Sequence, residues 1–172
     1  LLLAISQSGE TYDTISALKQ AQAKKAKTAA VVNVMGSTIA RMVDKVILQG
    51  SGPEICVIST KAALSQMVLM NLLALKLGLK NKTINRTRYR KHIDALHELP
   101  GIIQSILNER SGFIHRLAHQ YSKARNWLYL GRGIYYPIAL ESALKMKEVA
   151  YIHAEGMPGG FLKHGTLALI DS

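Results

Sequence analysis

The sequence is poor in cysteine, because Cys56 is the only one among 172 residues. A single cysteine cannot form an internal disulfide framework or a zinc site built from several thiolates. We therefore expect a reducing compartment, which we take to be the cytoplasm, and neither a metal site nor a cofactor. The segment EICVIST places no basic partner near Cys56, so we expect a small buried residue and not a nucleophile.

Acidic residues are also scarce, with 11 Asp and Glu against 22 Lys and Arg, and the net charge is +11. The basic residues cluster in KKAK (residues 24–27) and NRTRYRKH (residues 85–92). A nucleic-acid surface would explain such runs, but the second run has one aromatic residue, Tyr89, and no zinc finger or RNA-recognition motif accompanies it. We favour solvated helical faces and expect no nucleic-acid partner. The positive charge also suits an anionic small substrate.

The chain lacks a starting methionine and a signal peptide, and it begins inside the apolar run LLL. We expect from this that it starts within a strand of a longer protein. The longest apolar stretch, residues 62–80, is long enough to cross a bilayer. It contains Ser65, Gln66, Asn71 and Lys76, so we predict a buried amphipathic helix and no membrane association.

Short apolar runs alternate with helical patterns in the first half of the chain. This order is typical of a doubly wound α/β unit with a parallel sheet. We expect strands at residues 1–5, 28–34 and 45–50, and helices at residues 9–26, within 36–44 and at 62–80.

The pattern becomes helical, polar and basic in the middle of the chain. We expect breaks there at LPG (residues 99–101) and at Ser111-Gly112. Further on, NWLYLGRG predicts a strand and a loop, residues 136–155 a helix, and LALIDS (residues 167–172) an apolar strand. The sequence therefore predicts an α/β domain at residues 1–81, a helical connector at 82–126 and a second α/β domain at 127–172.

Polar residues follow the first predicted strand. Ser6, Gln7, Ser8 and Thr11 lie at the carboxyl end of a strand and before a helix, where anionic ligands bind in parallel α/β sheets. Gly9 would permit close approach of a ligand. The residues alone leave two interpretations open: an anion cradle, or a turn in which Ser8 caps the helix. No Walker motif occurs.

A second hydroxyl cluster, Ser59-Thr60-Lys61, precedes residues 62–80. The same choice applies here, because Ser59 could line a ligand pocket or cap the following helix.

The spacing of Glu141, Lys145 and Glu148 places them on one helical face. They form either an exposed ion pair or an acid–base set, in which Glu148 would move a proton between adjacent carbons of a sugar phosphate. His164 lies in the segment KHG, where an imidazole could act near neutral pH. We expect the other histidines to be structural or exposed residues in helical contexts: His92, His97, His115, His119 and His153.

SQSGET-x-DT, followed by GRG-x-x-YPIALESALKMKEVAYIHAEG and LKHGTLALID, resembles the sugar isomerase (SIS) family, and within it the glutamine–fructose-6-phosphate aminotransferases. The resemblance is weakest between residues 80 and 126. It implies two flavodoxin-like doubly wound subdomains, the first without its opening strand and helix and the second without its later elements. It also implies conversion of fructose 6-phosphate to glucosamine 6-phosphate by a homodimer, with ammonia from a glutaminase domain of the parent chain.

The resemblance also implies residue roles. Glu148 would transfer the proton between C1 and C2 with the help of Lys145, and His164 would open the sugar ring of the partner subunit. Arg132 and Glu141 would lie near the reacting sugar. Ligand contacts would come from Ser6, Gln7, Ser8 and Thr11 at the phosphate, and from Val57 and Ser59 at the sugar.

Two features depart from the family pattern. Phe161 precedes LKHG where an acidic residue is frequent, which changes the electrostatics around His164. The family's imine-forming lysine would lie beyond Ser172, so we expect that residues 1–172 alone do not complete the aminotransfer.

Two other functions share the phosphate-binding motif. One is another SIS isomerase or a deglycase that acts on amino-sugar adducts, and the other is a non-catalytic sugar-phosphate sensor joined to a DNA-reading domain. Neither function requires the complete pattern GRG-x-x-YPIALESALKMKEVAYIHAEG followed by LKHGTLALID. We therefore favour the aminotransferase.

Overall fold

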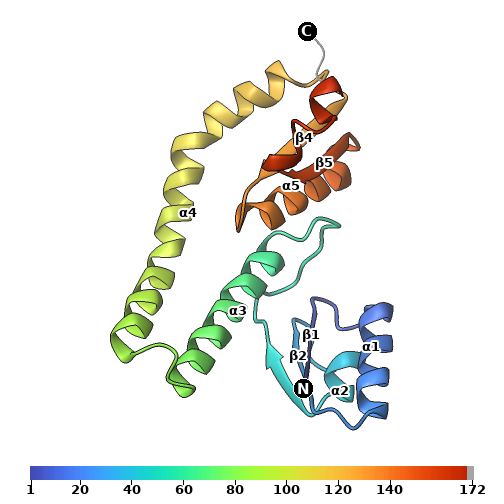
Figure 1. Ribbon diagram of the computed structural model, residues 1–172, viewed down its shortest axis with the longest axis vertical. Helices are drawn as coiled ribbons and strands as arrows, with labels where there is room; N and C mark the ends of the chain where they lie inside the picture. Colours follow the sequence, from blue (N-terminus) through green and yellow to red (C-terminus); the bar gives the residue numbers. More distant parts are fainter. Residues whose placement is uncertain (170–172) are drawn as a thin grey trace. The chain divides into compact units, whose positions relative to one another are not determined.

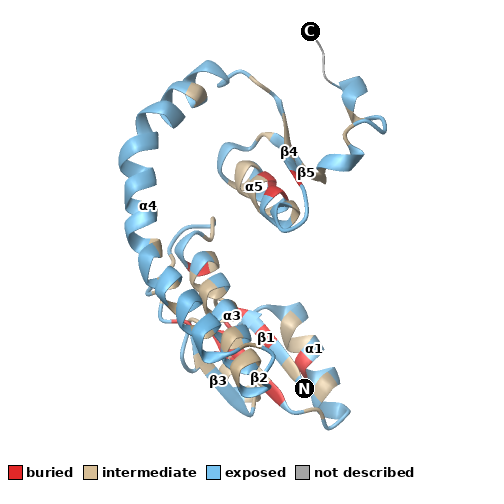
Figure 2. Cartoon of the chain, turned by 60° about the vertical axis from the view of Figure 1, so that its left-hand side comes forward, coloured by how far each residue is buried: buried red, intermediate tan, exposed pale blue. Residues whose placement is uncertain are grey.

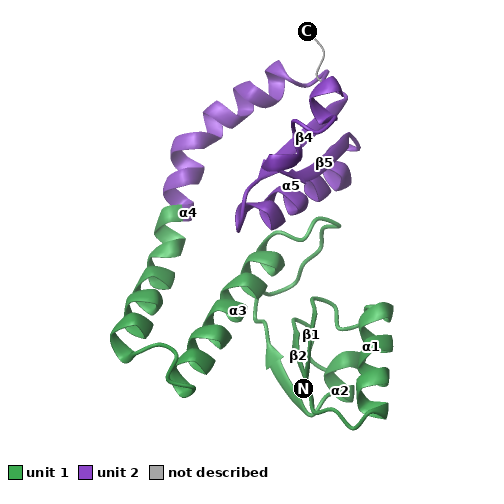
Figure 3. Cartoon of the chain, in the orientation of Figure 1, with its two compact units in different colours: residues 1–102 green, residues 103–172 purple. Residues whose placement is uncertain are grey.

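The computed structural model describes residues 1–169. The chain divides into two compact units, Leu1–Ile102 and the residues from Ile103 onward, and the boundary falls within one helix (Figure 3). The first unit holds a three-stranded sheet and the second a two-stranded sheet, and every strand pair is parallel. These sheets and their helices confirm the predicted α/β class.

The sheet of the first unit has the order β1 (Leu2–Ser6), β2 (Thr28–Val32) and β3 (Lys45–Leu48). Its register pairs Ser6 with Val32, and Val32 with Leu48. The carboxyl ends of the three strands therefore lie at one edge, where parallel α/β sheets bind ligands.

Helices lie on both sides of this sheet. Figure 1 shows α1 (Tyr12–Ala23) and α2 (Thr38–Met42) on one side and α3 (Lys61–Lys80) on the other. The residue of α1 that enters the core is Leu18, which is fully buried. The core of the unit consists of Ala4, Leu18, Ala30, Val32 and Ile39.

The prediction that residues 62–80 form a buried helix is wrong for the described chain, although the helix itself is present. Ala62 is the one buried residue of α3, and most of its length is exposed or half-exposed (Figure 2). A twenty-residue helix is about 30 Å long, whereas three strands spaced about 5 Å apart cover far less. Length and composition alone would also let α3 cross a bilayer.

One helix, α4 (Arg86–Gln120), replaces the interrupted connector predicted from the sequence. Pro100 lies inside it, and the helix also continues through Ser111-Gly112. The lost hydrogen bond at Pro100 is tolerated because no residue of α4 is buried and water can reach the released carbonyl. A glycine costs a helix only about 1 kcal/mol, which is too little to end it.

The second unit pairs β4 (Asn126–Gly131) with β5 (His153–Pro158), and α5 (Tyr135–Ala150) packs on both. Gly156 permits this packing, because a Cβ there would lie 2.6 Å from the Leu140 Cα. The last elements of the described chain are 3₁₀ turns at Gly159–Phe161 and Thr166–Leu169.

Two predictions for this unit are wrong. The helix does not reach residue 155, because Tyr151 adopts a left-handed conformation with φ of 56° and β5 follows, so His153 is in a strand. Residues 167–169 form a 3₁₀ turn and not a strand, since they pair with no neighbouring strand. The rest of the predicted strand, residues 170–172, lies outside the described residues.

Cys56 is exposed, which corrects the prediction of a buried thiol. It lies in the long loop between β3 and α3, and its neighbours Ile55 and Val57 are 95% and 86% exposed. The apolar residues of this segment indicated burial, but within the described part of the first unit no helix or strand packs over a loop that lies outside the sheet.

Asp44 connects the start of β2 to the turn before β3. Its Oδ2 accepts hydrogen bonds from the Thr28 backbone N–H (2.7 Å) and from the Thr28 hydroxyl (3.0 Å). These bonds hold the pKa of the Asp44 carboxyl below its usual range, and the bond from the Thr28 backbone has the larger effect.

We predict that Asp44→Asn changes how stability depends on pH. The carboxylate of Asp44 stabilises the folded protein at pH values above its unfolded-state pKa of about 3.9. This stabilisation is lost as the pH falls through the lower pKa of the folded state. The gap in unfolding free energy between the parent and Asp44→Asn should therefore narrow below about pH 4. Urea unfolding from pH 3 to 7 measures it. Asp94→Asn, at an exposed carboxylate of α4 without an ion pair in residues 1–169, is the control, and an equal narrowing there would contradict the assignment.

Candidate functional site

Asn33 joins the three loops that leave the carboxyl edge of the first sheet. Its backbone N–H donates to the Gln7 carbonyl (3.0 Å), and its Nδ2 donates to the Gly52 carbonyl (2.7 Å). Its Oδ1 accepts from the Ser51 N–H (3.1 Å). Sequence reasoning missed Asn33, although an amide directly after a buried strand was the available signal.

The loop after β1, residues 6–11, is folded on its own hydroxyl groups. The Ser6 and Thr11 hydroxyl oxygens are 2.8 Å apart, and the Ser6 Oγ accepts the Gly9 N–H (3.0 Å). The Ser8 Oγ accepts the Glu10 N–H (3.1 Å), which forms a local turn. Ser6 is buried, Gln7 and Ser8 are half-buried, and Thr11 is exposed. The predicted residues are therefore gathered around one short loop.

The interpretation of Ser8 as a helix cap is wrong. Thr11 occupies the N-cap position of α1, and no side chain within residues 1–169 caps this helix. The α1 N-terminus therefore keeps donor groups that an anion could accept.

The same loop is bound to the start of α2. The Ile39 N–H donates to the Gly9 carbonyl (2.9 Å), and the Thr38 N–H donates to the Glu10 Oε1 (2.7 Å). The latter bond is the main reason that the pKa of Glu10 lies below its usual range, so the carboxylate stays charged at neutral pH. Gly9 has φ of 68°, and a Cβ there would lie 2.0 Å from the Ser37 Oγ. Only glycine fits this position without displacing Ser37.

The loop between β3 and α3 carries the two residues predicted to line the sugar. Val57 is 86% exposed and Ser59 is half-buried. Ser59 does not cap α3, because Thr60 holds the N-cap position without a side-chain bond. No hydrogen bond within the described chain connects Val57 or Ser59 to residues 6–11, so their contact with a sugar stays a prediction.

The second group of predicted residues lies on α5 in the other unit. The Lys145 Nζ is 2.7 Å from the Glu148 Oε2 and 3.3 Å from the Glu141 Oε1. Lys145 and Glu148 are mostly shielded from solvent, whereas Glu141 is 43% exposed. The hydrogen bond to Glu148, followed by that to Glu141, raises the pKa of Lys145 against the opposing effect of burial. Lys145 is therefore an ammonium at neutral pH and can act as an acid, not as a base.

Arg132 and His164 flank this group in the sequence. Arg132 is exposed in the loop before α5, and its carbonyl accepts the Tyr135 N–H (3.1 Å) where the helix begins. His164 is also exposed, and its ring meets the Phe161 ring edge-on with centroids 6.4 Å apart. Within residues 1–169 no carboxylate pairs with the His164 ring.

Comparisons with known proteins identify relatives. The SIS domain model matches residues 1–76 and 120–172. The chain is 43% identical over 171 residues to the glutamine–fructose-6-phosphate aminotransferase (isomerizing) of Caldanaerobacter subterraneus subsp. tengcongensis, and 47% identical over 171 residues to that of Methanococcus maripaludis. Each match covers 99% of this chain, which spans 28% of the relative's length.

A solved structure is also similar. The C-terminal domain of glucosamine-fructose-6-phosphate aminotransferase from Francisella tularensis superposes with a TM-score of 0.92 at 37% identity. The match covers 98% of this chain and 47% of that one.

We predict that Gly9→Ala destabilises the first unit by about 2–5 kcal/mol, because a left-handed conformation and a collision with Ser37 add together. Gly36→Ala is the matched control: Gly36 has φ of 79°, but a Cβ there would meet nothing within 4 Å. That variant should lose only about 1–2 kcal/mol. Urea unfolding compares them, and equal losses would show that Ser37 does not restrict position 9.

Proposed function

The chain belongs to the SIS domain family, and we propose that it is the sugar-phosphate isomerase part of a glutamine–fructose-6-phosphate aminotransferase. The observation that carries this proposal is the Lys145–Glu148 pair, with 2.7 Å between ammonium and carboxylate, on one face of α5. The named aminotransferases at 43–47% identity over 99% of the chain support it.

Residues 6–11 would bind the phosphate. The hydroxyls of Ser6, Ser8 and Thr11 lie on one loop ahead of the uncapped α1 N-terminus, and hydroxyls and backbone N–H groups are suitable donors to phosphate oxygens. The Gln7 backbone is fixed by Asn33, which keeps the loop in place without ligand. In this proposal Val57 and Ser59 line the sugar.

Glu148 would transfer the proton that converts a ketose into an amino-aldose. Ammonia adds to the C2 carbonyl of fructose 6-phosphate and water leaves, which gives an imine. Glu148 then takes a proton from C1 and returns it to C2. The C1 hydroxyl loses its proton and the imine nitrogen gains one, so that C1 becomes the aldehyde carbon of glucosamine 6-phosphate. Lys145 holds a proton beside Glu148 and assists the transfer as an acid. Arg132 and Glu141 would adjust the charge around the reacting carbons, and the His164 of the partner subunit would open the ring.

The parts of the reaction that involve other chains or domains also belong to this proposal. Ammonia would come from a glutaminase domain of the parent protein, in accord with relatives more than three times as long as the chain. A homodimer in the cytoplasm would be the working form.

Ser8→Ala combined with Thr11→Ala should weaken fructose 6-phosphate binding to the complete gene product roughly tenfold or more, because each hydroxyl bonded to a charged group contributes about 1.5–3 kcal/mol. The shift of melting temperature against sugar concentration measures this loss. Thr87→Ala with Ser105→Ala, at exposed hydroxyls of α4, is the control. A normal shift in the first variant would remove residues 6–11 from the phosphate site.

Glu148→Gln should leave sugar-phosphate binding intact while C1–C2 proton exchange falls about 10²–10⁴-fold, because the amide cannot accept the proton. Exchange of the C1 hydrogen with deuterated water, followed by NMR, separates exchange from binding. Glu155→Gln removes another carboxylate of the second unit, on β5, and serves as the control. Exchange at the parent rate in Glu148→Gln would exclude Glu148 as the proton carrier.

A further inference from the structure

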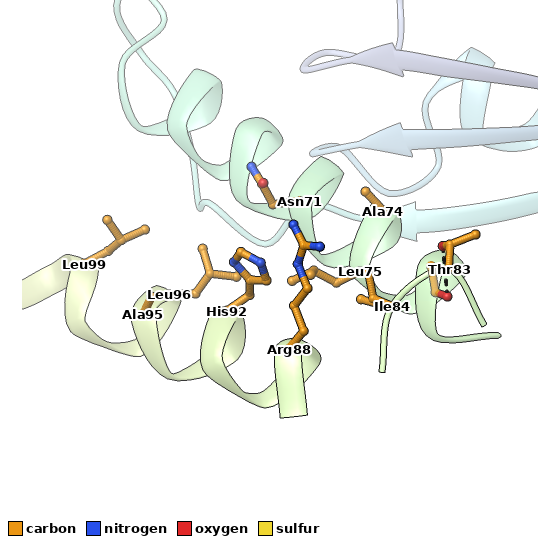
Figure 4. Close-up of a pocket in the computed structure, with 11 residues that line it drawn as sticks. Asn71, Ala74, Leu75, Thr83, Ile84, Arg88, His92, Ala95, Leu96 and Leu99 are labelled. Carbon is orange, nitrogen blue, oxygen red and sulfur yellow. Dashed lines mark hydrogen bonds between the residues drawn. The ribbon is translucent and has the colours of Figure 1, made fainter. Parts of the chain in front are cut away.

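A groove lies between α3 and α4 in the first unit, and none of the residues assigned to the sugar phosphate lines it. It encloses about 470 Å³, which is within the range of about 300–1,000 Å³ typical of small-molecule sites. Figure 4 shows its two walls, α3 above and α4 below. The apolar part of the lining comes from Ala74, Leu75, Ile84, Ala95, Leu96 and Leu99.

Two cationic or potentially cationic side chains of α4 line the same groove. Arg88 and His92 are one helical turn apart, and both point from α4 toward α3, so that the Arg88 guanidinium reaches the space beside Asn71 (Figure 4). Neither side chain forms an ion pair or a hydrogen bond within residues 1–169. The groove therefore presents donors that are open to solvent and pair with no protein group of the described chain, next to an apolar wall.

The surroundings do not neutralise Arg88. The first turn of α4 contains no acidic residue, so the positive end of its helix dipole adds to the guanidinium charge. The nearby carboxylates, Asp94 and Glu98, line an adjoining groove together with Arg90 and Lys91. His92 and Ala95 line both grooves, whereas Arg88 lines only the α3–α4 groove of the two. The α3–α4 groove is thus positively charged at one end and apolar along its length.

We propose that this groove binds a small organic phosphate, with the phosphate on Arg88 and His92 and the body of the ligand on Leu75 and Leu96. A guanidinium donates two parallel hydrogen bonds to a phosphate, which is its most favourable pairing with an oxyanion. Inorganic phosphate would use only the charged end and leave the apolar wall in water. The lining therefore selects a ligand that carries both a phosphate and an apolar or aromatic part.

This site is independent of the proposed isomerase. It uses none of residues 6–11 or the α5 residues, and it gives a role to the basic run at residues 85–92, which the sugar-phosphate reaction leaves without one. The two sites can therefore be separated by substitution.

The test uses the complete gene product with Ser8→Ala and Thr11→Ala, which removes the other proposed phosphate site. Isothermal titration with phenyl phosphate and with inorganic phosphate should show at least fivefold tighter binding of phenyl phosphate. Adding Arg88→Gln should weaken phenyl phosphate binding at least tenfold. Arg90 lies two residues from Arg88 and lines the other groove. Arg90→Gln removes the same charge and should leave phenyl phosphate binding unchanged. With residues 6–11 intact, Arg88→Gln should retain the melting shift with fructose 6-phosphate.

Equal affinities for the two probes would overturn the proposal, because the apolar wall would then contribute nothing. Equal losses in Arg88→Gln and Arg90→Gln would also overturn it, since general charge would explain the binding. An oligonucleotide that binds tighter than phenyl phosphate, and whose binding is weakened equally by both substitutions, would show a nucleic-acid surface instead.

If Arg88→Gln does not fold, Arg88→Lys retains the charge without the paired donors and should weaken phenyl phosphate binding severalfold. Unchanged binding in that variant would contradict the assignment.

Discussion

The hydrogen bonds of Asn33 hold together the edge of the sheet on which the first candidate site depends. One residue contacts the loops after β1 and β3 from its own place after β2. Loops at the end of a narrow sheet would otherwise be free to separate, because none of them has a core of its own. Residues 6–11 are supported from the other direction by α2, through Glu10 and the Gly9 carbonyl. The site is therefore preorganised by hydrogen bonds of the Asn33 and Glu10 side chains and of the backbone, and not by packing.

Alternation of apolar strands with helices was sufficient to predict the fold class and the elements of the first unit. The helix and strand ranges predicted there contain Leu18, Val31 and Val32, which are fully buried. Predictions failed where the local sequence was used to infer a tertiary environment. Cys56 looked buried because its neighbours are apolar, and residues 151–155 continued a helical pattern that ends when Tyr151 turns left-handed. Neither the covering of a loop nor the φ of a tyrosine is encoded by hydropathy.

The candidate site shows the same division. The spacing of Glu141, Lys145 and Glu148 predicted a shared face, since helix periodicity is fixed by covalent geometry. It could not predict that Lys145 lies nearer to Glu148 than to Glu141, because rotamers depend on local packing. The role of Asn33 could not be predicted for a related reason. Its role comes from three loops that are adjacent only after the strands have paired, and no spacing along the chain marks such a residue.

The exposed position of Cys56 has a practical consequence for experiments on this protein. Because residues 1–172 contain no second thiol, a maleimide dye or a nitroxide would attach within them at one point, next to Val57. The single tryptophan, Trp127, belongs to the other unit, so the native side chains offer one donor and one attachment point on separate units. Energy transfer between them would report the distance between these two points, with no engineered residue in these 172 positions.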